Sequence, residues 1–155
     1  MCALVLSGLT PDRLEIEITE LALLDKEAEH LKTIRQLKNL GITIALDDFG
    51  TGYSSASYVT KFPFDRIKID KSFTQGAAER KDCAAVIASV LALARGLDIA
   101  VTAEGVETEK QFQMLRNAGV ECAQGYLFGR PLPLLRFVEK TDVPSRQGVS
   151  KRAAS

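Results

Sequence analysis

Five polar side chains occupy equivalent places in the sequence, each near the end of a short stretch in which apolar and polar residues alternate. In chain order they are Glu17, Asp47, Lys68, Glu104 and Gln124. The residues of the other parity in these stretches are mostly apolar, which indicates strands that bury one face. The second face of these strands therefore carries three carboxylates, one ammonium group and one amide.

If the strands are parallel, these side chains meet at the carboxyl ends of the strands, where parallel α/β sheets and barrels bind ligands. Converging carboxylates repel one another and need a cation, because burying an unpaired carboxylate costs several kcal/mol. Carboxylate and amide oxygens with no nearby His or Cys favour Mg²⁺ or Mn²⁺. Asp47 and Asp48 share one strand end and offer ligands for two ions. The alternative is a set of solvated strand ends, which the shared parity of five residues disfavours.

Other chemistry has weaker support in the sequence. The one histidine, His30, lies in a charged helical stretch and is expected to face solvent, which leaves a Ser-His-Asp or Cys-His site without a base. The GTGYSS segment at 50–55 lacks the lysine of a P-loop, so it is either a turn or a mobile active-site loop. The three cysteines form no CxxC pair, which argues against a zinc site or a disulfide framework and for reduced thiols in the cytoplasm.

The elements that must position the polar residues alternate between strands and helices. Strands are expected over residues 13–19, 42–49, 66–70, 98–105 and 121–127. This alternation predicts an α/β fold with a parallel sheet and right-handed crossovers.

Helical spacing and stop signals predict the connections between these strands. Helices are expected over 26–40, 54–60 and 81–95, with Gly96 after the last of them. Thr108 and Gln111 form a capping box that begins a further helix, which ends near Gly119. A final helical turn is expected over 134–140, and the polar residues 141–155 are expected to be a disordered tail.

Length and charge limit the function classes. The chain has 155 residues, 20 basic and 20 acidic, and this balance argues against a nucleic-acid binder. No apolar run reaches the roughly 20 residues of a membrane span, and no signal peptide is expected. A closed (β/α)8 barrel needs about 200 residues at least. The length therefore predicts one domain and excludes a complete barrel of this kind.

Five segments together resemble a known family. They are EITE (17–20), DDFGTGYSS (47–55), KID (68–70), AEGVE (103–107) and QGYLFGRPLP (124–133). In order and spacing they resemble the EAL-domain phosphodiesterases, which cleave the bacterial second messenger cyclic di-GMP, over roughly residues 9–135. The resemblance implies a TIM-like barrel, hydrolysis of one phosphodiester bond to give linear pGpG, and two Mg²⁺ or Mn²⁺ ions, with Ca²⁺ inhibitory.

The resemblance also implies roles for individual residues. Glu17 and Asp47 match metal ligands, and Asp48 matches the ligand that favours the second ion. Lys68 matches a lysine that orients the attacking water or neutralises charge. Glu104 matches a base or a partner of metal-bound water, and Gln124 matches a residue that contacts such water. Glu20 matches a glutamate that tethers the loop 47–55, and Glu107 matches a further motif carboxylate.

The sequence departs from the family pattern in its first part. The Glu-Ala-Leu signature and a downstream Asn ligand are absent, so the resemblance implies that residues 1–140 form a partial EAL domain, an incomplete TIM-like barrel of about five strands with exposed sheet edges. The resemblance implies cyclic di-GMP as ligand and a homodimer that forms through the loop 48–55. The exposed sheet edges are expected to contribute to the same dimer. Two alternatives remain: a non-catalytic cyclic di-GMP-binding or interaction module, and a barrel hydrolase acting on another phosphodiester.

Overall fold

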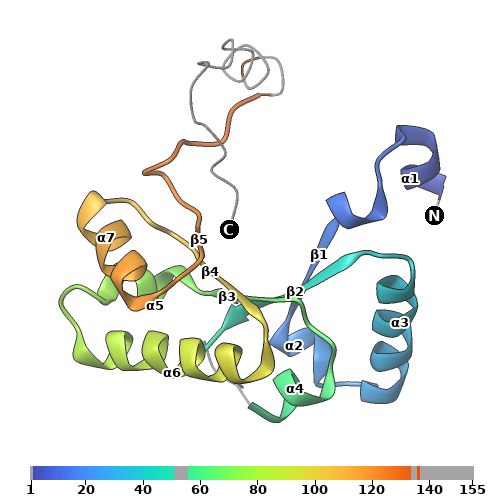
Figure 1. Ribbon diagram of the computed structural model, residues 1–155, viewed down its shortest axis with the longest axis horizontal. Coiled ribbons are helices and arrows are strands. Elements are labelled where there is room, and N and C mark those ends of the chain that lie inside the picture. Colours follow the sequence, from blue (N-terminus) through green and yellow to red (C-terminus); the bar gives the residue numbers. More distant parts are fainter. Residues whose placement is uncertain (1, 51–55, 134–135, 137–155) are drawn as a thin grey trace, which may run out of the picture.

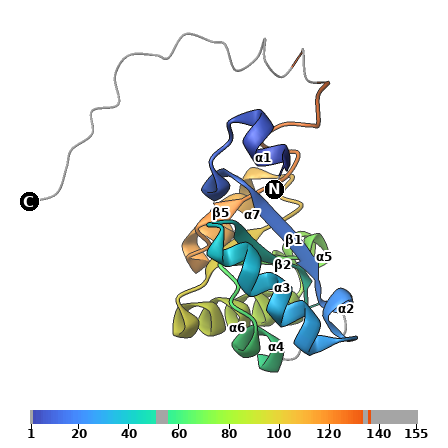
Figure 2. The same ribbon diagram turned by 90° about the vertical axis from the view of Figure 1, so that its right-hand side faces the viewer.

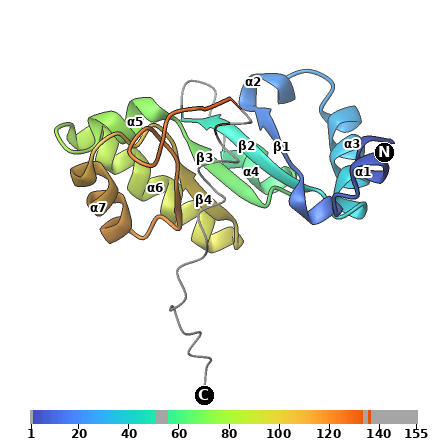
Figure 3. The same cartoon turned by 90° about the horizontal axis from the view of Figure 1, so that it is seen from above.

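One parallel sheet organises the molecule, and the computed structural model describes residues 2–50, 56–133 and 136. Its five strands follow chain order across the sheet, and all pairings are parallel. The strands are β1 (Glu15–Thr19), β2 (Thr43–Phe49), β3 (Arg66–Ile69), β4 (Ala100–Ala103) and β5 (Cys122–Ala123). The predicted α/β fold with a parallel sheet is confirmed. Figure 3 shows the strands from above as a curved, open array.

Helices precede β1 and connect the successive strands. They are α1 (Cys2–Ser7), the 3-10 turn η1 (Pro11–Arg13), α2 (Glu20–Leu23), α3 (Glu27–Asn39), α4 (Ala56–Lys61), α5 (Lys71–Gly76), α6 (Lys81–Leu97) and α7 (Glu109–Ala118). The helices α3, α4 and α6 lie along one side of the sheet (Figure 1). Within the described residues β1 pairs only with β2, and Figure 2 shows it along the near edge of the sheet.

The apolar face of the sheet packs on the helices as the alternation predicts. Ile44, Leu46, Ile67 and Ile69 are fully buried and belong to one core cluster with the apolar residues of α6. The alternate residues face the other way, and the register places Glu17 beside Ala45, Thr19 beside Asp47, and Lys68 beside Thr102. The parallel register therefore brings the polar strand ends to one region.

Two helix ends illustrate how local chemistry sets the boundaries. The predicted capping box is present: the Thr108 hydroxyl accepts from the Gln111 N–H, and the Gln111 side chain accepts from the Thr108 N–H. The expected end of α6 before Gly96 is wrong. The helix continues to Leu97 because Asp98 adopts the left-handed conformation, with φ 56°, and its N–H donates to the carbonyls of Ala94 and Arg95.

Other expectations differ from the structure or fall outside the described part. Strand β5 has only two residues, because the chain leaves the strand ladder at Gln124 and pairs with the loop after β4. His30 is half-buried rather than solvent-facing. Three predicted segments lie outside the described residues. They are the first two residues of the helix over 54–60, the turn over 134–140 apart from Arg136, and the tail 141–155. No helix in the described part is long and apolar enough to cross a membrane.

Candidate active site

The Lys68 side chain is the centre of a charged cluster at the strand ends. Its Nζ lies 2.6 Å from Glu17 Oε1, 2.6 Å from Glu104 Oε1 and 3.4 Å from Asp47 Oδ1. Each of the four residues comes from a different strand or strand end, β1 to β4. We call these four residues the Lys68 cluster. The predicted convergence of the polar strand ends is present, with a lysine ammonium at its centre.

Charge in the Lys68 cluster is unbalanced. Burial by itself lowers the pKa of the Lys68 ammonium, but the hydrogen bonds to Glu104 and Glu17 and the nearby Asp47 raise it above its usual value overall. Lys68 is only 5% exposed and stays protonated at neutral pH. One ammonium group faces three carboxylates, so the cluster attracts further cations.

The two aspartates at the end of β2 are held in unfavourable surroundings. The Oδ1 atom of Asp47 is buried and has no hydrogen-bond partner in the described part of the chain; Lys68 is its charged neighbour. Asp48 has a left-handed backbone, with φ 55°, which is uncommon outside glycine. Burial, then Asp47 and Asp70, raise the pKa of the Asp48 carboxyl, although Lys68 and Lys71 oppose the rise. Such features are typical of functional sites.

The donor set fits a hard divalent cation in part. Carboxylate oxygens, such as those of Glu17 and Asp47, are ligands that Mg²⁺ and Mn²⁺ prefer. Across residues 2–50, 56–133 and 136, however, no three His, Cys, Asp or Glu side chains converge closely enough to hold one metal ion. The described chain therefore offers some ligands of a metal site, and further ligands have to come from elsewhere.

A polar cavity of about 310 Å³ lies beside the Lys68 cluster. Glu104, Glu107 and Gln124 line it, so the structure brings three of the predicted residues together there. Two further lining residues, Lys71 and Gln75 of α5, were not predicted, and the Gln75 amide donates to Glu107 Oε1 at 3.1 Å. Glu20 is 8% exposed at the start of α2, away from this cavity lining.

Helix α5 was missed because six residues are too few for a helical hydrophobic period. A signal was present, since Asp70 precedes Lys71 and Ser72 in the way an N-cap residue precedes a first turn. In the structure the Asp70 carboxylate accepts from the Ser72 N–H at 2.9 Å. Burial alone would raise the pKa of Asp70, but the hydrogen bonds from Ser72 and Lys71 lower it overall.

Replacing Asp70 by alanine is expected to cost about 1 kcal/mol of unfolding free energy at pH 7, the usual value of an N-cap. A lowered carboxyl pKa in the folded state stabilises the fold above the ordinary pKa of about 3.9, and the contribution is lost as pH falls through the folded value. The difference in unfolding free energy between wild type and Asp70→Ala should therefore be largest at pH 7 and shrink as the pH falls below the ordinary carboxyl pKa. Asp70→Asn keeps a hydrogen-bond acceptor that does not titrate, so the difference between Asp70→Asn and Asp70→Ala should not change with pH. If the difference between wild type and Asp70→Ala also stays constant in acid, this account is contradicted.

Fold and cluster together define a class, a barrel-type α/β protein whose strand ends carry an acidic, cation-attracting site. The family comparison is more specific. The model of the EAL domain matches residues 2–131, and the protein belongs to the EAL domain family. The resemblance predicted from the five sequence segments is confirmed.

Relatives with curated names support the same family. An uncharacterized signaling protein of Caulobacter vibrioides is 52% identical over 133 residues, which cover 84% of this chain and 16% of that protein. The cyclic di-GMP phosphodiesterase RocR of Pseudomonas aeruginosa is 42% identical over 84% of this chain and 33% of its own length. The chain thus spans a third or less of these two relatives.

Solved structures agree on the fold and on what related domains bind. The PaMucR phosphodiesterase in complex with c-di-GMP aligns with TM-score 0.82 and 39% identity, over 88% of this chain and 55% of that one. A manganese and c-di-GMP complex of Klebsiella pneumoniae BlrP1 aligns with TM-score 0.79 and 37% identity, over 84% and 33%. Metal binding beside cyclic di-GMP is therefore a property of the family; BlrP1 is also seen with calcium.

Proposed function

We propose that this chain is part of a cyclic di-GMP phosphodiesterase, which hydrolyses one phosphodiester bond of cyclic di-GMP to give pGpG. The observation that carries the proposal is the Lys68 cluster, in which one ammonium group faces three carboxylates at the strand ends. The family membership and the named phosphodiesterases among the relatives support the choice of substrate.

Within this proposal, Glu17 and Asp47 hold a first Mg²⁺ or Mn²⁺ ion, and Asp48 contributes to a second. Two such ions lower the pKa of a water molecule and neutralise charge on the attacking and leaving oxygens. The buried Asp47 Oδ1, which has no hydrogen-bond donor among the described residues, supports its role as a ligand. Ca²⁺ in place of these ions is proposed to inhibit.

Lys68, Glu104 and Gln124 act on the substrate side. The charged Lys68 ammonium would neutralise phosphate charge and orient the attacking water. Glu104, whose Oε1 lies 2.6 Å from Lys68 Nζ, would accept a proton from that water or hold a water on the metal. Gln124 contacts such a water from across the polar cavity that it lines with Glu104. Glu20 is proposed to tether the loop 47–55, and Glu107 to bind ligand in the same cavity.

Assembly and location follow from the same proposal. The strand β1 has no neighbour on one side within the described residues, so its backbone groups are open to another strand. A homodimer through this edge and the loop 48–55 is proposed, although residues 51–55 of that loop lie outside the described part. A protein that acts on an intracellular messenger is placed in the cytoplasm.

A second candidate function is a cyclic di-GMP-binding or interaction module without catalysis. It is favoured by the absence of a Glu-Ala-Leu segment from the sequence and by the lack of three converging metal ligands among the described residues. The intact cluster around Lys68 argues for the phosphodiesterase.

Turnover distinguishes the two candidates. The chain is assayed for pGpG formation with and without Mn²⁺, alone and fused behind the first part of the RocR EAL domain, which supplies the additional strands. We expect the fusion to form pGpG only with Mn²⁺, and Asp47→Ala to lower its rate by at least about 100-fold, as for loss of a metal ligand. Tight cyclic di-GMP binding by the fusion without turnover would select the binding module instead.

A further inference from the structure

Two chain segments that adjoin site carboxylates rest on the short helix α5. The first is the end of β2 with the Gly50 that follows it, whose φ is +105°. A Cβ atom at this position would lie 2.7 Å from Cε2 and 3.1 Å from Cζ of Phe73. The backbone just after Asp47 and Asp48 is therefore pressed against the face or edge of the Phe73 ring, at a distance that only glycine allows.

The second segment follows β4 and meets the same helix two residues earlier, at Lys71. Gly105, next to Glu104, has φ +68°, and a Cβ atom there would overlap the Cβ of Lys71 and lie 3.1 Å from its Cα. The loop that carries Glu104 therefore lies directly on the first residue of α5. Two carboxylates of the Lys68 cluster, Asp47 and Glu104, share one support.

Helix α5 is itself held firmly. Asp70 caps its first turn, and Thr74 is fully buried in its middle. At its end, a Cβ on Gly76 would lie 2.7 Å from the Sγ of Cys83, so α5 packs closely on α6. A helix fixed at both ends can define the position of the loops that rest on it.

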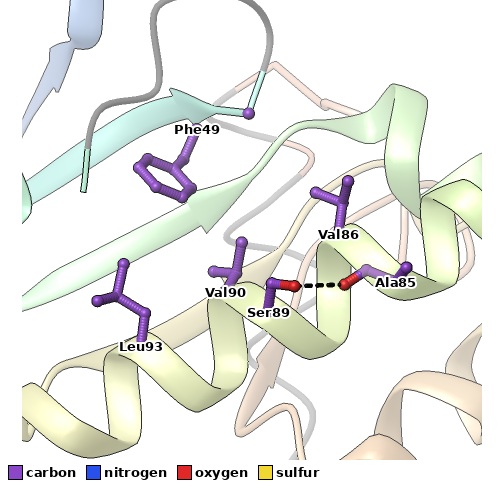
Figure 4. A pocket seen from close by; sticks show the side chains of 7 residues that line it. Phe49, Ala85, Val86, Ser89, Val90 and Leu93 are labelled. Carbon is purple, nitrogen blue, oxygen red and sulfur yellow. Dashed lines mark hydrogen bonds between the residues drawn. The ribbon is translucent and has the colours of Figure 1, made fainter.

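At the end of β2, the Phe49 ring faces a cavity beside α6. The Phe49 ring points from β2 toward α6, as Figure 4 shows, and is 6% exposed. It borders an apolar cavity of about 500 Å³ lined also by Val86, Val90 and Leu93. Gly50 borders the same cavity on one side, and the three atoms nearest to a Cβ at Gly50 all belong to the Phe73 ring.

We propose that Phe73 is a positioning residue for the Asp47–Asp48 pair. Its ring fixes the backbone at Gly50, and through that backbone it fixes the direction of the two carboxylates. It touches neither metal nor substrate. The part of this proposal that concerns metal affinity rests on the proposed function, whereas the part that concerns the strand end does not.

Hydrogen exchange of the full chain tests the structural part. In Phe73→Leu we expect the amides of Asp47 to Gly50 to exchange about tenfold faster, as expected for local opening, while α3 and β1 are unchanged. Phe112→Leu is the matched control, because Phe112 is also half-buried on a helix but packs on Phe128. It should leave the Asp47–Gly50 amides unchanged. Phe73→Met, whose flexible side chain fills part of the space of the ring, gives the same test if the leucine variant does not fold.

Mn²⁺ affinity tests the functional part; it is measured by electron paramagnetic resonance on the same variants fused behind the first part of the RocR EAL domain, which is proposed to supply the remaining ligands. We expect the dissociation constant to rise about tenfold in Phe73→Leu and to stay constant in Phe112→Leu, the size seen when a residue supporting a metal ligand is lost. If wild type binds no Mn²⁺, the proposed metal site fails, while the exchange data still test Phe73. Exchange that is unchanged in the Phe73 variants, raised throughout the sheet, or raised equally by Phe112→Leu overturns the proposal.

Discussion

Replacing Lys68 by methionine is expected to destabilise the fold by about 3 kcal/mol, the lower end of the range for breaking a buried ion pair. The variant keeps the aliphatic stem but leaves Glu17, Asp47 and Glu104 facing one another without their ammonium group. The lower end applies because the Glu17 side chain is 46% exposed, so water relieves part of the repulsion. Urea unfolding at pH 7 in metal-free buffer measures the loss.

Lys61→Met is the matched control for this experiment. Lys61 also pairs with a carboxylate, Glu27 Oε1 at 3.1 Å, but both side chains are largely exposed. An exposed pair contributes about 0–1 kcal/mol, so this variant should unfold almost as wild type does. Equal losses in the two variants would show that the Lys68 ammonium does not hold the carboxylates together.

Gly125→Ala is expected to cost about 3 kcal/mol or to prevent folding, because the added Cβ would overlap the backbone of Val106. The atoms in the way are N and O of Val106, with its carbonyl carbon at 2.7 Å, and backbone cannot turn aside as a side chain can. The same contact holds the Gln124 loop against the loop that carries Glu104, since Val106 N–H donates to Gln124 O at 3.0 Å. Thermal and urea unfolding measure the effect.

Gly96→Ala is the matched control: the chemical change is the same, but we expect it to stabilise the protein. Gly96 lies inside α6, and a Cβ there would meet nothing within 4 Å. The substitution should stabilise the protein by up to about 1 kcal/mol through helix propensity. If Gly125→Ala were as well tolerated as Gly96→Ala, the two loops would not be in the close contact that the structure describes.

The strand ends could be predicted from the sequence because side chains alternate with a fixed period of two. Once Ile16 and Ile18 are placed in the core, Glu17 must face the other side, and parallel pairing then brings it near Lys68. Local signals also sufficed for α7, where Thr108 and Gln111 complete a capping box. These features depend on residues close together in the chain.

Contacts between residues that are far apart in the chain could not be predicted from the sequence. The site support by α5 depends on Gly50 meeting Phe73 and on Gly105 meeting Lys71, which lie more than twenty residues apart. The sequence predicted Lys68 on the same face as the carboxylates, but its ion pairs with three of them needed coordinates. The end of α6 was misplaced because Gly96 is a common helix stop, whereas Asp98 adopts the left-handed conformation here.

The most direct test of the account is Mn²⁺ binding, followed by electron paramagnetic resonance, in the fusion to the first part of the RocR EAL domain, with the wild-type sequence, Asp47→Ala or Asp82→Ala in the part contributed by this chain. Asp82 is an exposed aspartate paired with Arg80, so its loss controls for general surface charge. The account predicts binding that weakens by at least about tenfold in Asp47→Ala and is unchanged in Asp82→Ala. Absence of binding in wild type, or equal binding in all three proteins, would contradict a divalent-cation site at the Lys68 cluster.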